Sequence, residues 1–320
     1  MSPSLYDKLP LTDEYTFSQQ LGSEAERVLR RHRETWITEN DFKWLAERGI
    51  NAVRIPFGYW ILESDGPFVK SPEVLDHAID LCERYKIQAV LDLHGLPGFQ
   101  SGEGHSGRRR HFRWPADEGH LRHSLDVIEA LAGRYAGRKG VSALSLVNEP
   151  SERLSRDVLV SFYAAAAERV RRHMPPEEVA VVISAYPENR MSEFHGCLPE
   201  VPNVWTDVHL YQSFCDWPNE DPFSYIRAAA ERHDRLRHWL SQGEVIVGEW
   251  SLSWPSRLVG PKSELSSLAH EGLMRAYADV QLASFEATRG WFFWSYKVED
   301  RPEWSFRDAV ERGWMPDCYS

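Results

Sequence analysis

Cysteine is scarce in this chain of 320 residues, and its four cysteines show neither C-x-x-C spacing nor another metal-binding pattern. Cys82 falls on the apolar face of an expected helix, so we expect a free buried thiol there. No stretch reaches the roughly 18 apolar residues that a membrane-spanning helix needs. The first residues lack a basic segment followed by an apolar run, so we expect a cytoplasmic protein without a signal peptide. We would expect a secreted protein only if the natural N-terminus lies upstream of Met1.

Positive charge is in deficit. The chain has 37 Lys and Arg against 48 Asp and Glu, a formal net charge of −11, which argues against nucleic acid or an anionic membrane as a partner. The one basic run, Arg108–Arg110, is short and is expected to be a solvated loop. No glycine-rich phosphate loop, G-x-S-x-G motif or H-E-x-x-H motif occurs. These absences disfavour a phosphate cradle, a catalytic serine and a zinc site. The oligomeric state is not fixed by the sequence, although a sheet edge left by a missing strand would invite pairing with a partner.

Strand and helix patterns alternate through most of the chain. The expected strands are a segment ending at Arg54 before Pro56, and then 87–93, the LSLVNEP stretch at 144–150, 179–184, 204–210, 244–250 and 291–296, with helices between them. This alternation predicts parallel strands with helical crossovers. We predict an α/β fold, a (β/α)₈ TIM-type barrel that lacks its first strand because only seven are identifiable. Without repeats or linkers, residues 1–320 are expected to form a single domain. An open doubly wound sheet is the main alternative.

Polar residues fall where the expected strands end. The carboxyl ends of barrel strands meet at one face, where catalysis takes place, so these side chains are expected to share one site. The positions are Arg54, His94, Asn148, Glu149, His209, Tyr211, Glu249 and Trp294.

Two of these residues, Glu149 and Glu249, each follow or end a buried apolar strand. A buried carboxylate is costly unless it is paired or used. Retaining glycosidases use two carboxyl groups about 5–5.5 Å apart, one as the nucleophile and one as the acid and then the base. We predict Glu149 to be the acid/base and Glu249 the nucleophile of such an enzyme. A structural ion pair is the alternative.

The other polar residues have roles that fit this hypothesis. Asn148 is expected to bind a sugar 2-hydroxyl, Arg54 to keep Glu249 ionised and Tyr211 to orient it. The two histidines, His94 and His209, are expected to bind sugar hydroxyls or Glu149, although buried histidines with structural partners are common. Trp294 is expected to form the floor of the sugar subsite, whereas Asp92, inside a strand, is expected to be structural.

At these residues the chain resembles glycoside hydrolase family 5, and within it the fungal exo-β-1,3-glucanase branch. The similarity spans nearly the whole chain and rests on LGSEAERVLRRHRETWITENDFKWLAERGINAVRIPFGYW, LDLHGLPG, LSLVNEP, DVHLYQSF, VIVGEWS and GWFFWSYKVEDRPEWSF. The resemblance implies a retaining mechanism without metal or organic cofactor. It assigns Glu149 as acid/base and Glu249 as nucleophile, and it adds Phe214 as an aromatic residue at the pocket entrance.

The chain departs from this family pattern in three ways. Met1–Tyr6 resembles the family segment that follows the first barrel strand, so we expect that strand, and the acidic residue near it that usually grips the terminal glucose, to be absent. The family proteins are usually secreted, whereas we expect no secretion signal in this chain. Where the branch has an aromatic–acidic pair after LDLHGLPG, this chain has Glu103 and Gly104. We predict hydrolysis of β-1,3-linked glucans or oligosaccharides. The alternatives are a β-glucosidase or endo-β-glucanase acting on other glucans or glucolipids, and a non-catalytic sugar-binding barrel.

Overall fold

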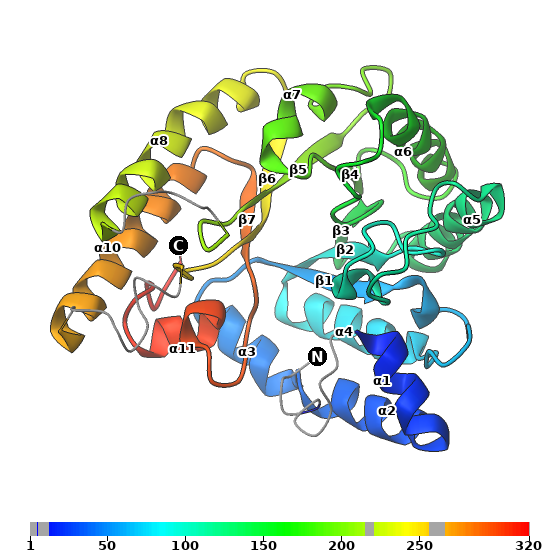
Figure 1. The fold of residues 1–320 in the computed structure, drawn as a ribbon, viewed down its shortest axis with the longest axis horizontal. Helices are drawn as coiled ribbons and strands as arrows, with labels where there is room; N and C mark the ends of the chain where they lie inside the picture. The colour runs from blue at the N-terminus through cyan, green and yellow to red at the C-terminus, as the bar shows by residue number, and fades with distance from the viewer. Residues whose placement is uncertain (1–4, 6–12, 215–220, 256–265, 320) are drawn as a thin grey trace. The chain divides into compact units, whose positions relative to one another are not determined.

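A computed structural model describes residues 5, 13–214, 221–255 and 266–319 of the chain. Its elements are labelled in Figure 1. The chain divides into two compact units, Met1–Trp205 and Thr206–Ser320, and each is described here by itself. The expectation of a single domain over residues 1–320 stays a prediction.

The first unit opens with three helices and then alternates strands with helices. Its strands follow the order β1-β2-β3-β4, and the neighbouring pairs are parallel. The elements are α1 (Glu14–Leu21), α2 (Ala25–Thr35), α3 (Glu39–Glu47), β1 (Ala52–Gly58), α4 (Pro72–Tyr85), β2 (Gln88–Gly95), α5 (Glu118–Tyr135), β3 (Val141–Ser145), α6 (Arg156–Arg171), β4 (Ala180–Ser184) and the short α7 (Met191–Phe194).

Local sequence determines where the helices of this unit begin. The carboxylate of Asp41 accepts a hydrogen bond of 2.7 Å from the backbone N–H of Thr38, which completes the capping box of α3. Pro72 occupies the first turn of α4, where its missing N–H costs no hydrogen bond. Both helices therefore begin where a local sequence signal stands.

The second unit continues the alternation. Its strands follow the order β5-β6-β7, and β6 and β7 are parallel. The elements are β5 (Val204–Leu210), which begins just before the division, α8 (Pro222–Leu240), β6 (Glu244–Trp250), α10 (Ser267–Phe285), β7 (Gly290–Phe293) and α11 (Phe306–Glu311). The hydroxyl of Ser284 in α10 donates to the carbonyl of Ala229 in α8, 3.0 Å away, and so ties these two helices together.

The strands differ in exposure. In the first unit nearly all of β2 and all of β4 are buried, whereas β1 is partly exposed over its first five residues. In the second unit β6 is buried after its first residue, whereas every residue of β7 is partly exposed. Among the described residues, the strands number seven and none precedes β1, as the sequence predicts. No described helix has the length and apolar character needed to cross a membrane.

Two strand boundaries differ from expectation. We expected the first strand to break at Pro56, but β1 runs through it to Gly58. Its backbone pairs in parallel with β2, and a proline, which has no N–H, is tolerated in a strand that is paired along one side. β3 ends at Ser145, so the fully buried Leu146 and Val147 belong to the turn that leads to Asn148 rather than to the strand.

Candidate active site

In the first unit, Asp92 organises the ends of β1 and β2. Its side chain is fully buried, and Oδ2 lies 3.1 Å from Nη2 of Arg54 and 2.7 Å from Nδ1 of His94. Arg54 Nη2 also donates to Oδ1 of Asn148 at 2.7 Å. These two partners offset the free-energy cost of burying the carboxylate. Asp92, which the sequence analysis expects to be structural, thus contacts both Arg54 and His94 and holds their side chains in place.

His94 and Asn148 contact each other directly. Nδ2 of Asn148 lies 3.3 Å from Nε2 of His94, whose other ring nitrogen faces Asp92. Both contacts are satisfied at once by the tautomer that carries its proton on Nδ1, because Nε2 then accepts from the amide. Three residues predicted from strand ends, Arg54, His94 and Asn148, thus form one network.

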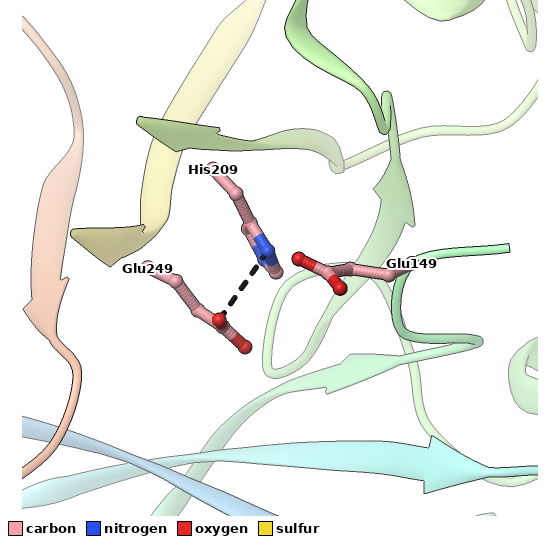
Figure 2. A group of neighbouring side chains, drawn as sticks. All are labelled: Glu149, His209 and Glu249. Atoms are coloured by element: carbon pink, nitrogen blue, oxygen red, sulfur yellow. Dashed lines mark ion pairs between the residues drawn. The ribbon is translucent and has the colours of Figure 1, made fainter. Parts of the chain in front are cut away.

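Glu149 follows this network in the turn after β3 (Figure 2). The residue is 9% exposed and its backbone has φ +37°, in the left-handed region that few non-glycine residues adopt. Its Oε2 lies 3.7 Å from Nε2 of His105, a residue of the short helical turn Gly104–Ser106. The carboxyl group is therefore nearly enclosed, with an imidazole beside it that the sequence analysis did not single out.

In the second unit, Glu249 lies near the end of β6 and is 5% exposed. The hydroxyl of Tyr211 donates to its Oε2 at 2.8 Å, and Nδ1 of His209 lies 3.5 Å from the same oxygen, an ion pair drawn as a dashed line in Figure 2. This hydrogen bond holds the carboxyl group of Glu249 in one orientation, and the predicted part of Tyr211 in catalysis stays a prediction.

A second aspartate supports His209. Oδ2 of Asp207 lies 3.4 Å from Nε2 of His209, and Oδ1 accepts from the backbone N–H of Gly248 at 2.8 Å. Gly248 immediately precedes Glu249. Asp207 therefore links the orientation of His209 to the backbone of the strand that carries Glu249.

An aromatic cluster lies beside Tyr211. Ring centroids are 5.5 Å apart for Tyr211 and Trp304, 5.7 Å for Tyr211 and Phe214, and 6.1 Å for Phe214 and Trp304. Phe214 is 74% exposed, so its ring is available to a ligand. Trp294, just after β7, donates its backbone N–H to the carbonyl of Trp250 at 2.8 Å. Its predicted contact with a sugar stays a prediction.

Asp207, His105 and Trp304 are neighbours that sequence reasoning did not identify. A signal for Asp207 was present, because DVH places Asp and His two residues apart on a strand, as LDLH does for Asp92 and His94, and such residues share a face. No comparable signal marked His105 or Trp304, which come from a loop and a short turn. The predicted action of Arg54 on Glu249 stays a prediction.

The comparison with known proteins decides the family. The model of the family described as cellulase (glycosyl hydrolase family 5) matches residues 17–299, which is most of the chain. The chain belongs to glycosyl hydrolase family 5. It is accordingly a glycoside hydrolase, the enzyme class predicted from the two glutamates.

Relatives of this family 5 member align along its whole length. A "Glucan 1,3-beta-glucosidase" from Yarrowia lipolytica is 32% identical, with 100% of this chain and 85% of the relative covered. A "Probable glucan 1,3-beta-glucosidase A" from Emericella nidulans is 31% identical, with 99% and 86% covered. The resemblance to the exo-β-1,3-glucanase branch is thereby confirmed.

Solved structures agree on the fold. The crystal structure of a rutinosidase from Aspergillus niger superposes with a TM-score of 0.79 at 20% identity, covering 98% of this chain and 93% of that one. The predicted fold class, a (β/α)₈-type barrel with seven identifiable strands, is confirmed.

Proposed function

We propose that this family 5 enzyme hydrolyses β-1,3-glucosidic bonds in glucans or their oligosaccharides, with retention of configuration at the anomeric carbon. The substrate is inferred from the alignment, at 32% and 31% identity over nearly the entire chain, with proteins named as glucan 1,3-β-glucosidases. The two buried glutamates, each at or after the end of a strand, support the mechanism.

Glu249 is the proposed nucleophile. A nucleophilic carboxylate must be held still, and Glu249 has the hydroxyl of Tyr211 at 2.8 Å and the imidazole of His209 at 3.5 Å from one of its oxygens. The backbone behind it is held through Gly248 and Asp207.

Glu149 is the proposed acid/base. Its side chain is nearly enclosed, and enclosure disfavours a charged carboxylate, which suits a group that must carry a proton at the start of the reaction. Its neighbour Asn148 is fixed by Arg54 and His94, so the amide is preorganised to bind the sugar 2-hydroxyl.

The reaction then has two steps. The carboxylate of Glu249 attacks the anomeric carbon, the glycosidic C–O bond breaks, and Glu149 gives its proton to the departing oxygen. Ionised Glu149 next removes a proton from water, the water oxygen bonds to the anomeric carbon, and Glu249 is released. Two displacements restore the original β configuration.

The remaining predicted residues would bind the substrate. The side chains of Arg54, His94 and His209 are nearly buried and present polar groups that suit sugar hydroxyls. The exposed ring of Phe214 and the indole of Trp294 are proposed to stack on the apolar faces of sugar rings. No residue of this set needs a metal or cofactor for these roles.

The test follows hydrolysis of laminari-oligosaccharides by NMR for the wild type and for Glu249→Gln. The wild type should release β-configured product first, and the variant should lose at least about a thousandfold in rate. Glu244→Gln, at the exposed start of the same strand, is the matched control and should keep wild-type activity. An α-configured first product, or an active Glu249→Gln variant, would contradict the proposal. Glucose alone indicates exo action, and a ladder of longer products indicates endo action.

A further inference from the structure

Gln100 is a fully buried residue of the loop that follows β2. Its side-chain Nε2 donates to two backbone carbonyls, those of His94 and Asn148, both at 2.8 Å. Its Oε1 accepts from the backbone N–H of Leu96 at 2.9 Å. A side-chain amide has two N–H donors and one carbonyl, and each of them is used here. Gln100 thus joins the end of β2 to the turn after β3.

These bonds hold the backbone on both sides of Glu149. The carbonyl of Asn148 belongs to the peptide group that leads into Glu149, and the side chain of Gln100 fixes that group. On the other side, the backbone N–H of Ser151 donates to the backbone carbonyl of Gln100 at 2.9 Å. One residue therefore clamps the chain before and after the proposed acid/base.

Glu149 needs such a clamp because of its backbone conformation. A non-glycine residue at φ +37° is in a sparsely populated region of backbone conformations and persists there only where the surroundings enforce it. The angle φ measures the rotation of Glu149 against the peptide group whose carbonyl Gln100 holds. If that hold is lost, φ can relax and the carboxyl group moves away from its working position.

We propose that Gln100 is a positioning residue for acid catalysis, which acts by locking the peptide group before Glu149. The inference rests on the proposed role of Glu149. The variant Gln100→Glu keeps the shape of the side chain but has no N–H to donate to the two carbonyls. Gln100→Met keeps the length and introduces no charge.

The test uses aryl β-glucosides whose leaving groups differ in acidity, with kcat/KM as the readout because it reports bond cleavage. An aryl group such as 2,4-dinitrophenol leaves without protonation, whereas phenol needs the acid. General acid catalysis contributes about 10²–10⁴-fold, so both variants should lose at least about tenfold on phenyl β-glucoside and less than about threefold on the dinitrophenyl substrate. An equal loss on both substrates would overturn the proposal.

A double-mutant cycle adds a second criterion. Since Gln100 acts through Glu149, Gln100→Glu should cost nothing more on phenyl β-glucoside when combined with Glu149→Ala. Additive losses would contradict the proposal. Ser106→Ala is the matched control, because Ser106 is buried in the same loop but bonds only within it, to Ser101 and Glu103. It should lower the melting temperature without any dependence on the leaving group.

The same data separate this proposal from the proposed function. If Glu149→Ala shows the leaving-group dependence and azide restores its turnover, Glu149 is the acid/base, and the behaviour of the Gln100 variants alone decides the inference. If Glu149→Ala shows neither, the assignment of Glu149 itself fails.

Discussion

At position 248 the carboxylate of Asp207 occupies the space that a side chain would need, so glycine is the residue that fits there. A Cβ at this position would overlap both carboxylate oxygens, whose contacts run to the backbone N–H of Gly248 and to His209. This lack of space requires glycine at position 248, which immediately precedes the proposed nucleophile Glu249.

Gly248→Ala should accordingly displace Asp207 and disturb Glu249. Overpacking of a buried site costs about 1–3 kcal/mol, so we expect a lower free energy of unfolding together with a marked loss of kcat. Urea unfolding and steady-state kinetics measure the two effects. Gly290→Ala is the control, since a Cβ there meets nothing within 4 Å. Equal behaviour of the two variants would refute the steric explanation.

Tyr211→Phe isolates the hydroxyl that donates to Glu249. Its loss removes a hydrogen bond to a charged group, worth about 1.5–3 kcal/mol, which corresponds to roughly a 10- to 150-fold fall in kcat/KM if the bond is kept through the transition state. Tyr163→Phe, which removes the buried hydroxyl bonded to the carbonyl of Ser184, should lower stability and leave kcat unchanged. An unchanged kcat/KM in Tyr211→Phe would show that orientation of Glu249 does not depend on Tyr211.

The residues that sequence reasoning finds and those it misses differ in a physical way. Glu149 and Glu249 stand out because a charge at the end of an apolar strand is unusual. Gln100 does not stand out, because its partners are backbone carbonyls and every residue has one. His105 is equally hidden, since a loop has no periodicity that would aim its ring at Glu149.

At the level of elements, arginines link the outer helices of the first unit. Arg138, after α5, donates to both oxygens of Glu83 and to Asp80 in α4. The hydrogen bond from Arg138 holds the pKa of Glu83 below its ordinary value. Partly exposed pairs of this kind contribute little, so the link adjusts stability and does not determine the fold.

Arg138→Met should lower the free energy of unfolding at pH 7 by less than about 1 kcal/mol. Because the pKa of Glu83 is depressed in the folded state, the stabilisation is present above the ordinary value of about 4.3 and is lost as pH falls through the folded value. Urea titrations at neutral and at acidic pH check this. Lys139→Met, an exposed neighbour with the same charge, is the control. A difference that grows in acid would contradict the assignment.

Element types are easier to predict than their limits. Buried helices and strands of both units follow their apolar periodicity. The sequence analysis missed α1, because the eight residues of EYTFSQQL bury only Phe17 and Ser18 and show no clear stripe. We expected the first strand to end before Pro56, because the sequence does not tell whether the side of the strand that would need the missing N–H is paired.

At the scale of the whole molecule, the proposed glucan substrate is neutral, so the protein's net charge of −11 neither attracts nor repels it appreciably. We expect kcat/KM on laminari-oligosaccharides to change less than about twofold between about 0.05 and 0.5 M sodium chloride, because screening removes only interactions between charges. Initial rates at constant pH check this. A steep salt dependence would point to a charged substrate instead.

The strands differ in exposure, and their backbone amides are therefore expected to differ in how fast they exchange with deuterium. Backbone amides of buried strands exchange with deuterium only through rare openings, whereas partly exposed strands open at lower free energy. Within the first unit β2 should therefore exchange more slowly than β1, and within the second unit β6 more slowly than β7. Equal protection within either pair would disprove this. We therefore expect the backbone around the proposed nucleophile Glu249, on β6, to open less often than that of β7. The backbone around Arg54, on β1, should open more often than that of β2, while the Arg54 side chain stays held by Asp92 and Asn148.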